Sequence, residues 1–369
     1  MAPSLPASAR LYVRPCGFID APFGFDGQCA RLAGGLLWFS AYEVIAREAG
    51  RRVGHWLVPV CDIDAAVRGN AGAQAQLHAI AAARPPLQLG ARTIRMDQPQ
   101  VMGILNLTPD SFSDGGRFID DPASAAAAGI DMAAAGAAII DVGGESTRPG
   151  AKAVWVQDEI ARIVPVIERL AAAGTAVSID TRQAETMEAA LAAGATLIND
   201  VSALCHDPRA LDVVVQSGMP VVLMHSPDAA KSLHGDGEMR GDPLLDVYDW
   251  LEERVKMVVA AGVDRAKILV DPGIGFGKGL AANLAIINGL ALFHGLGCPL
   301  VVGASRKRLI GALSHEAPVG ERLGGSLALA LTAAQAGVQM VRVHDVAETV
   351  QALKIWRGLR DAALTPMGG

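Results

Sequence analysis

The chain has 369 residues, of which 51% are apolar and 19% are charged, a composition typical of a well-buried globular α/β protein and not of a disordered one. The formal net charge is −6 and no basic stripe is visible, so the sequence argues against nucleic acid as a main partner. Any site for an anion must therefore be a local cluster of cations.

The cysteines are scattered, odd in number and without a C-x-x-C pair: Cys16, Cys29, Cys61, Cys205 and Cys298. This pattern disfavours a disulfide framework or a zinc site and indicates reduced thiols in a cytoplasmic protein. The N-terminus lacks the basic-then-apolar pattern of a signal peptide. The apolar segment around 32–46 is too short and too charged to span a bilayer, so we expect no membrane partner.

Residues 1–95 predict a small α/β appendage. The patterns indicate strands at 10–15, 53–60 and 87–95, and helices near 28–49 and 64–83, the second ended by Pro85 and Pro86. The segment carries no catalytic constellation, so we expect its role to be structural.

From about residue 100 a short apolar run, a polar loop and an amphipathic helix alternate. The predicted strands are 100–106, 138–141, 176–180, 196–199, 220–225, 267–271, 299–303 and 339–343. The predicted helices are 122–135, 157–173, 183–193, 207–217, 244–261, 281–293, 321–336 and 346–361. This alternation predicts a (β/α)8 TIM barrel over residues 96–369, with a doubly wound open sheet as the alternative fold.

The most informative stretch is the apolar run 101–107 followed by the polar segment 108–116, Thr-Pro-Asp-Ser-Phe-Ser-Asp-Gly-Gly. It predicts a buried strand that opens into a mobile loop, with Asn106 at the junction. A polar loop at the C-terminal end of a barrel strand is typical of an active site.

Every predicted barrel strand ends at a polar or adaptable side chain. The ends are Asn106, Asp141, Asp180, Asn199 with Asp200, Met224 with His225, Asp271, Ser305 to Lys307, and Arg342 to Asp345. A single aspartate here would most often cap a helix, and we expect this role for Asp200 and Asp345. Polar groups at all eight ends are not explained by capping alone, so we expect a site at this face of the barrel.

The residues at the strand ends fall into two subsets that differ in chemistry. Asp180, Asn199, Asp271 and Lys307 combine carboxylates, an amide and an ammonium, which suits a planar heterocycle with several hydrogen-bonding groups. Arg342 and His344 follow the last strand, where barrels often hold phosphate, and alternation along the strand puts them on the same face.

The segment Asp271-Pro-Gly-Ile-Gly-Phe-Gly-Lys278 is rich in glycine but lacks the spacing of a Walker A motif. We expect its glycines to let the backbone approach a ligand closely and to project Phe276 as a stacking or packing surface.

Together these motifs resemble the dihydropteroate synthase family. The matching segments are Leu105-Asn-Leu-Thr-Pro-Asp-Ser-Phe-Ser-Asp-Gly-Gly116, Gly143-Gly-Glu-Ser-Thr-Arg-Pro-Gly150, Ser178-Ile-Asp-Thr181, Ile198-Asn-Asp200, the glycine segment 271–278, Ser305-Arg-Lys307 and Arg342-Val-His-Asp345. They occur in family order through about residues 98–362, which makes the combination very specific.

The resemblance implies condensation of a dihydropterin diphosphate with 4-aminobenzoate to give 7,8-dihydropteroate and diphosphate, with Mg²⁺ on the leaving group. It implies that Asp180, Asn199, Met224, Asp271 and Lys307 bind the pterin. It assigns Asn106, Thr147, Arg342 and His344 to the diphosphate, with Asn106 at the metal. It assigns Phe112, Arg148, Pro149, Phe276 and Ser305 to the aminobenzoate and its loops. The catalytic roles fall on Asp180, Lys307 and Arg342, and a homodimer is implied.

Two alternatives stay open. One is a pterin-binding methyltransferase that takes a methyl group from methyltetrahydrofolate, which would not need the anion cluster. The other is a non-catalytic pterin-binding protein. The sequence also departs from the family at Gly279, where threonine is common, in the long segment 225–243, and in the first 95 residues.

Overall fold

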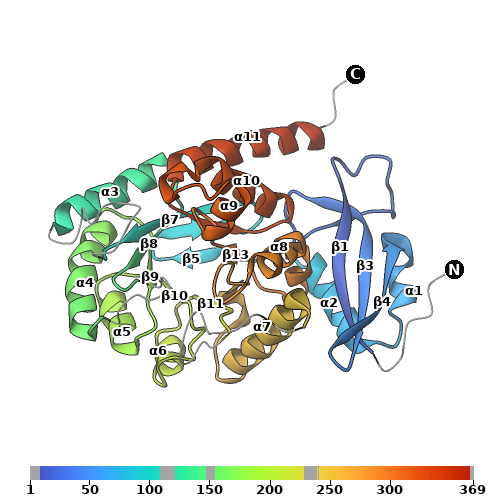
Figure 1. The fold of residues 1–369 in the computed structure, drawn as a ribbon, viewed down its shortest axis with the longest axis horizontal. Helices are drawn as coiled ribbons and strands as arrows, with labels where there is room; N and C mark the ends of the chain where they lie inside the picture. The colour runs from blue at the N-terminus through green and yellow to red at the C-terminus, as the bar shows by residue number, and fades with distance from the viewer. Residues whose placement is uncertain (1–8, 109–120, 147–153, 228–238, 240, 366–369) are drawn as a thin grey trace.

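The computed structural model describes residues 9–108, 121–146, 154–227, 239 and 241–365. Its centre is an eight-stranded parallel sheet with the order β12-β11-β10-β9-β8-β7-β14-β13. A parallel bridge between Val270 and Leu300 joins the two ends of this order and closes the sheet into a barrel (Figure 1). The predicted TIM barrel is confirmed, and the open-sheet alternative is wrong.

The barrel strands are β7 (Gln100–Asn106), β8 (Ile139–Gly143), β9 (Val177–Asp180), β10 (Leu197–Asp200), β11 (Val221–Met224), β12 (Ile268–Asp271), β13 (Val301–Val302) and β14 (Met340–Val343). The helices that surround them are α3 (Pro122–Ala135), α4 (Val156–Ala172), α5 (Ala184–Ala192), α6 (Ala210–Ser217), α7 (Pro243–Ala260), α8 (Leu280–Asn288), α9 (Arg308–Leu313), α10 (Leu323–Gln335) and α11 (Val346–Leu364). Short 3₁₀ turns lie at η2 (Arg265–Lys267), η3 (Leu290–Leu296) and η4 (Val319–Glu321).

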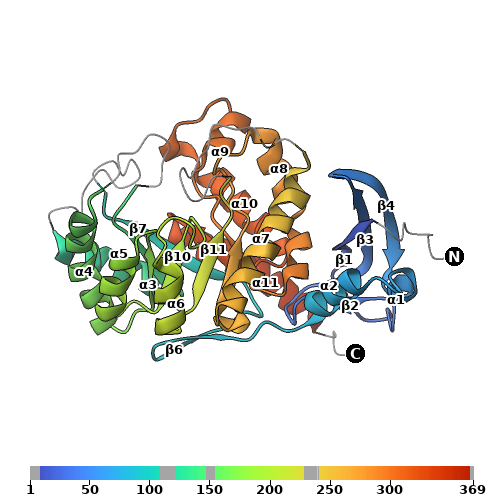
Figure 2. The same cartoon turned by 90° about the horizontal axis from the view of Figure 1, so that it is seen from below.

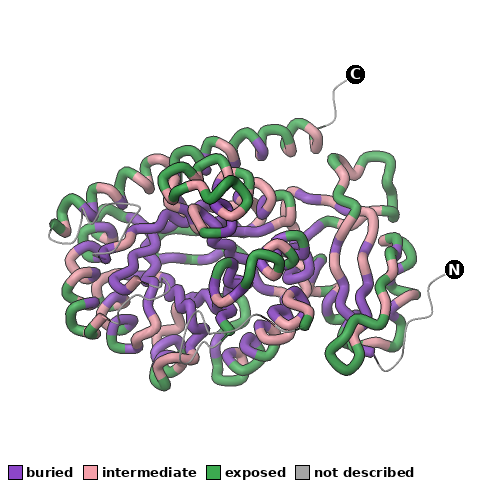
Figure 3. Tube along the Cα trace, in the orientation of Figure 1, coloured by how far each residue is buried: buried purple, intermediate pink, exposed green. Residues whose placement is uncertain are grey.

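Burial explains why these strands form. In β9, β10, β11 and β12 every residue is buried, as expected for parallel strands that are covered on both faces (Figure 3). Valine, isoleucine and leucine dominate these segments, and branched side chains pack well on a pleated surface.

Side-chain caps explain where two of the helices begin. The Asp121 carboxylate accepts hydrogen bonds from the backbone N–H groups of Ala123 and Ser124 at the start of α3. Asp242 accepts the N–H of Leu245 in the same way at the start of α7. Proline follows each cap, at a position where no N–H is needed.

A short hairpin closes the N-terminal end of the barrel. It consists of β5 (Leu87–Leu89) and β6 (Arg92–Ile94), which pair antiparallel and replace the single strand predicted over 87–95, because the chain reverses at Gly90 with a positive φ of 59°. Its buried side chains join one apolar cluster with the inward-facing residues at the base of the barrel strands, including Met102 and Leu197. Figure 2 shows the hairpin beneath the barrel, on the side opposite the loops that follow the strands. The ligand site must therefore lie at the other end.

The N-terminal appendage is an antiparallel sheet, which corrects the predicted helix at 28–49. Its strands are β1 (Arg10–Ile19), β2 (Ala30–Arg31), β3 (Trp38–Glu48) and β4 (Arg51–Pro59), followed by η1 (Val60–Asp62), α1 (Ile63–Ala66) and α2 (Ala71–Ala81). β3 lies in the centre, with β1 along one edge and β2 and β4 along the other.

The correction has a local and a tertiary reason. Gly34 adopts a positive φ of 68°, and an added Cβ would lie 2.6 Å from the Cβ of Ala83, so the chain turns here instead of continuing a helix. The segment that follows is rich in aromatic and branched residues and obtains backbone partners on both sides, which favours a strand.

The appendage packs against the side of the barrel formed by α7 and η3. Tyr12 is fully buried, its ring meets Tyr248 edge-on at 5.6 Å, and its hydroxyl donates to the carboxylate of Asp249. Arg47 pairs with Asp246 and Asp249 of α7. One apolar core cluster includes residues of the appendage and of the barrel, so the two parts are packed as one body.

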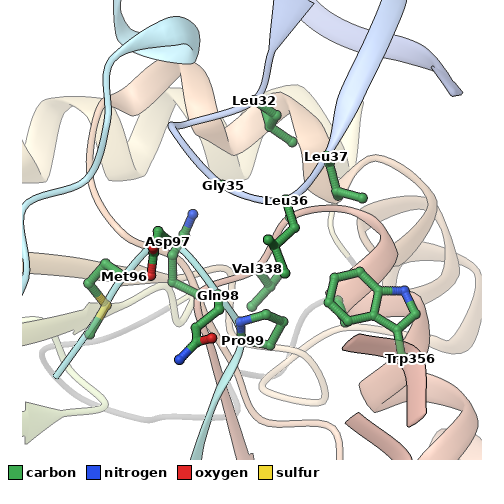
Figure 4. Close-up of a pocket in the computed structure, with 13 residues that line it drawn as sticks. Leu32, Gly35, Leu36, Leu37, Met96, Asp97, Gln98, Pro99, Val338 and Trp356 are labelled. Atoms are coloured by element: carbon green, nitrogen blue, oxygen red, sulfur yellow. The ribbon is translucent and has the colours of Figure 1, made fainter. Parts of the chain in front are cut away.

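A cavity of only about 20 Å³ remains where the appendage meets the base of the barrel. Its lining includes Leu36 of the appendage, Val338 before β14 and Trp356 of α11 (Figure 4). A space of this size holds about one water molecule and no organic ligand. The tight packing here agrees with a structural role for the appendage.

No helix in the described part of the chain is long and apolar enough to cross a membrane. All five cysteines are free thiols.

Candidate active site

A cleft of about 930 Å³ opens at the C-terminal end of the barrel. Ligand sites of this kind usually range up to about 1,000 Å³, so the cleft has room for two small substrates. Residues at the ends of β7, β9 and β14 line it, together with the loops that follow β8, β12 and β13. The polar and aromatic lining residues are Asn106, Thr108, Glu145, Ser146, Asp180, Phe276, Lys278, Asn283, Ser305, Arg306, Lys307, Arg308, Arg322, Arg342 and His344.

Arg342 bridges two carboxylates across the cleft floor. Its Nε donates to Oδ2 of Asp141 at 2.6 Å, and its Nη2 donates to Oδ2 of Asp180 at 2.7 Å. The Asn199 amide donates to the same oxygen of Asp141 at 3.0 Å. Four strands, β8, β9, β10 and β14, are tied together by these contacts. The structure thus joins the two subsets that the sequence separated, because Arg342 from the anion group contacts Asp180 from the heterocycle group.

Burial and mutual attraction act in opposite directions on these charges. Burial raises the pKa of the Asp180 carboxyl, Arg342 opposes that rise, and the neighbouring Asp141 adds to it. Burial would lower the pKa of Arg342, but the carboxylates of Asp141 and Asp180 outweigh burial and raise that pKa. Arg342 therefore stays charged, and its charge compensates two acids.

Lys307 forms a second charged centre, next to Asp271 and Phe276. Its Nζ donates to the carbonyl oxygen of Ile274 and lies 4.4 Å from the centroid of the Phe276 ring, within the range of a cation–π contact. Burial lowers the pKa of Lys307 to about 8; Asp271 opposes the change and Arg342 adds to it. Burial likewise raises the pKa of Asp271.

An apolar wall stands beside these charges. Val201, Met224 and Phe276 form a small buried cluster separate from the main core. Met224 ends β11, whereas Phe276 belongs to the glycine segment after β12. An apolar surface beside carboxylates and an ammonium is what a planar polar heterocycle needs, because its ring and its edges are contacted by different groups.

Ser305 and His344 are in direct contact. The Ser305 hydroxyl lies 3.1 Å from Nδ1 of His344 and also accepts the His344 backbone N–H at 3.2 Å. The resemblance assigned them to different subsites, so these subsites meet at this pair. The next residue, Arg306, has a positive φ of 57° and pairs with both carboxylate oxygens of Asp345.

Both predicted helix caps are wrong, since neither Asp200 nor Asp345 caps a helix through its side chain. The Asp200 carboxylate accepts the backbone N–H groups of Ser202 and Leu204, so it caps a turn. Asp345 precedes α11, but its side chain makes no cap hydrogen bond. Its partner Arg306 comes from a different strand end, which local sequence reasoning could not foresee.

The donors in the cleft fit Mg²⁺ only together with a substrate that brings further ligands. In the described part of the chain, no group of three or more His, Cys, Asp or Glu residues could hold a metal ion by itself. Asn106 lines the cleft and offers an amide oxygen. Mg²⁺ commonly takes one or two protein ligands and obtains the rest from water and substrate phosphates, so a donor set of this kind fits a metal that arrives with a diphosphate.

The structure brings together most of the predicted residues that it describes. Asn106, Asp180, Phe276, Ser305, Lys307, Arg342 and His344 line the cleft, and Asn199, Met224 and Asp271 are buried beside them. Phe112, Thr147, Arg148 and Pro149 lie outside the described residues. Several contributors were not assigned to the site from the sequence. Among them are Asp141, a strand-end aspartate like Asp180, and Lys278, the last residue of the glycine segment.

The fold and the cleft define a parallel (β/α)8 barrel whose strand ends bring carboxylates, an amide and cations together in one cleft. Residues 102–344 match the family described as pterin binding enzyme. The dihydropteroate synthase of Escherichia coli strain K12 is 43% identical over 264 residues, which cover 71% of this chain and 92% of that protein. The relative from Bacillus subtilis strain 168 is also 43% identical, over 256 residues that cover 69% of this chain and 86% of that protein.

Solved structures agree. The dihydropteroate synthase of Xanthomonas albilineans with 4-aminobenzoic acid has a TM-score of 0.70 and 46% identity, and the match covers 75% of this chain and 98% of that one. The Burkholderia cenocepacia dihydropteroate synthase complexed with 7,8-dihydropteroate has a TM-score of 0.68 and 39% identity, with 76% and 98% covered. The chain belongs to the dihydropteroate synthase family of pterin-binding transferases, which act in folate biosynthesis.

Proposed function

We propose that this cleft condenses 6-hydroxymethyl-7,8-dihydropterin diphosphate with 4-aminobenzoate, giving 7,8-dihydropteroate and diphosphate. The observation that carries the proposal is the Arg342 bridge to Asp180 and Asp141, which puts a cation for a leaving anion directly beside carboxylates for a pterin. A cleft of about 930 Å³ surrounds both groups.

The pterin is proposed to lie against Met224, with its polar edge toward Asp180, Asn199, Asp271 and Lys307. Carboxylates accept hydrogen bonds from the ring N–H and amino groups, and the Lys307 ammonium donates to a ring acceptor. These side chains are held by the rest of the protein before the ligand arrives. A preorganised polar site of this kind rejects ligands that leave its buried groups unpaired.

Arg342, His344, Asn106 and Thr147 are proposed to receive the diphosphate. The bond between the pterin CH₂ carbon and the diphosphate oxygen breaks, and its electron pair leaves with the diphosphate. Preorganised cations and donors stabilise the charge that develops on this leaving group. Mg²⁺, held through Asn106 and the diphosphate, would add charge stabilisation of the same kind.

The aminobenzoate is proposed to bind beside Phe276 and Ser305, with contributions from Phe112, Arg148 and Pro149. Its amino nitrogen attacks the CH₂ carbon and then releases a proton. Asp180 and Asp271 stabilise the positive charge on the pterin while the bond to oxygen is broken. Exclusion of water from the closed site prevents capture of this carbon by hydroxide or water.

Turnover measured with the two substrates tests the proposal. We expect one diphosphate and one dihydropteroate for each aminobenzoate consumed, and no product when either substrate is omitted. Binding of the pterin diphosphate without any turnover would instead favour a non-catalytic pterin-binding protein. Methyl transfer from methyltetrahydrofolate would favour the alternative reaction.

A homodimer in the cytoplasm is part of the same proposal. The scattered free thiols support a reducing compartment. Light scattering coupled to gel filtration measures the assembly directly, and a mass of one chain would refute the dimer.

A further inference from the structure

Lys278 has a buried ammonium whose hydrogen-bond acceptors are all backbone carbonyls. Its Nζ donates to Gly273 O at 2.7 Å, to Phe276 O at 3.0 Å and to His225 O at 3.3 Å. The residue is only 9% exposed and lies at the edge of the cleft. Burial lowers the pKa of Lys278 to about 7. What joins these backbone segments is the set of hydrogen bonds from one Nζ to three carbonyl oxygens, which charge strengthens when the amine is protonated.

The segments that meet at Lys278 carry the apolar wall of the cleft. His225 directly follows Met224, and Phe276 contributes another of the three carbonyls. Met224 and Phe276 belong to one small buried cluster with Val201. Lys278 binds the backbone next to Met224 and the backbone of Phe276. The position of these two side chains relative to each other therefore depends on Lys278.

The loop after β11 and the glycine segment after β12 approach each other very closely. Their spacing should therefore be sensitive to loss of the Lys278 hydrogen bonds. Gly273 has a positive φ of 69°, and an added Cβ would lie 1.9 Å from the carbonyl oxygen of His225. Its N–H donates to Oδ1 of Asp271 at 2.7 Å. The orientation of the Asp271 carboxylate thus depends on the same stretch of backbone.

Asn283 supports the loop from the other side. Its Oδ1 accepts the Gly275 N–H at 2.7 Å, and its Nδ2 donates to the carbonyls of Lys278 and Gly279 at 2.8 and 2.9 Å. Asn283 is 3% exposed. Gly275 in turn packs against the Lys307 side chain, since an added Cβ would lie 2.9 Å from its Cδ.

We infer that Lys278 is a positioning residue that sets the distance between the pterin surface at Met224 and the aminobenzoate surface at Phe276. The inference rests on the proposed function, because it assigns those two surfaces to the two substrates. Lys278 itself need not contact either substrate. Its effect passes through the backbone of the loop after β11 and of the glycine segment after β12.

Lys278→Met tests this, since methionine keeps a long apolar side chain and removes the ammonium. A misplacement of reacting groups by about 1 Å can cost on the order of 10²-fold in rate, so we expect a fall in kcat of that order together with a higher KM for aminobenzoate. The affinity for inorganic diphosphate with Mg²⁺, measured by calorimetry, should stay within about two-fold, because Arg342 lies in β14 and His344 directly follows that strand, away from the loop that Lys278 binds.

Lys267→Met is the matched control. Lys267 also donates from Nζ to a backbone carbonyl, Gly218 O at 2.7 Å, but it precedes β12 at the opposite end of the barrel. This variant should keep the kinetic constants of the wild type.

The outcomes separate the inference from the proposed function. Wild-type protein without turnover refutes the proposed function. If the wild type is active and Lys278→Met has unchanged kcat and KM, the inference alone is refuted. It is also refuted if Lys278→Met loses diphosphate affinity as strongly as it loses turnover, because that would show general damage to the site. If Lys278→Met does not fold, Asn283→Ala loosens the same loop and must show the same split between aminobenzoate and diphosphate, or the inference is wrong.

Discussion

Arg–Asp networks occur in two regions of this molecule, and they differ in position and in use. In the cleft, the side chain of Asp141 is 0% exposed, that of Asp180 is 7% exposed, and both pair with Arg342 of β14, which is not a neighbouring strand of either. At the appendage, Arg10 is 41% exposed, and it pairs with Asp249 and Glu252 on the surface of α7. The same residue types thus form a buried site at the strand ends and a docking contact on a helix face.

The difference follows from desolvation. Charges removed from water are costly unless they are paired, but once paired they offer a ligand strong and directional contacts. Exposed pairs are screened by water and typically contribute about 0–1 kcal/mol each. We therefore expect changes in the cleft network to alter catalysis and stability together, whereas changes at the appendage should alter stability alone.

Arg342→Met should give the largest effect. It removes the cation of the leaving-group site, and loss of one such donor typically costs on the order of 10²–10³ in rate. It also leaves Asp141 and Asp180 buried without their cation, and an unpaired buried charge costs about 3–5 kcal/mol. Steady-state kinetics and chemical unfolding measure the two effects separately.

A second substitution tells these two effects apart. Asp180→Asn combined with Arg342→Met removes one of the stranded charges and should recover part of the unfolding free energy without recovering turnover. Because Arg342 contacts Asp180, we also expect the bare pterin to bind Arg342→Met more weakly than it binds the wild type. Full activity in Arg342→Met would contradict the assignment of the anion site.

Asp180→Asn alone should give the second-largest effect. The variant keeps the side-chain volume but loses charged hydrogen bonds, each contributing about 1.5–3 kcal/mol. Calorimetry with a pterin that lacks the diphosphate should show this loss as weaker binding. Unchanged pterin affinity would remove Asp180 from the site.

The pH dependence of kcat/KM should report the deprotonation of the buried Lys307. Lys307 donates a strong, charge-assisted hydrogen bond to the pterin only while it is protonated, and burial lowers its pKa to about 8. The value of kcat/KM for the pterin diphosphate should therefore fall above about pH 8, by roughly ten-fold for each pH unit if this group alone controls it. Lys307→Arg should move this alkaline limb to higher pH.

Stability should change in the opposite direction over the same range. The folded-state pKa of Lys307 is below its unfolded value, so between about pH 8 and 10.5 the unfolded chain binds more protons. The contribution of this group to the free energy of unfolding then rises with pH. A parallel fall of stability and activity above pH 8 would show that unfolding, and not Lys307, causes the loss.

Arg47→Met should give the smallest effect and complete the comparison. Arg47 pairs with Asp246 and Asp249 across the appendage contact, with 13% of its side chain exposed. We expect a loss of about 1–2 kcal/mol of unfolding free energy, because hydrogen bonds to charged groups are lost at a partly buried position. The kinetic constants should not change. A lower kcat under conditions where the variant is fully folded would show that the appendage affects the cleft.

The sequence by itself determined the barrel and most of the chemistry of its mouth. Strand and helix periodicity depends on neighbouring residues, so the alternation after residue 100 could be followed without a structure. Strand ends in a barrel converge for topological reasons, which is why Asp180, Asp271 and Lys307 could be grouped from their positions alone.

Only the tertiary structure decided how these groups pair. The partners Asp141 and Arg342 are about two hundred positions apart, and nothing local indicates that one aspartate would hold both Arg342 and Asn199. The sequence pattern predicts a helix where β3 lies, because the strand depends on the backbone partners that β1 and β4 supply. Lys278 shows the same limit: its place in the glycine segment could be read from the sequence, but the three carbonyls around its ammonium come together only when two strand ends meet.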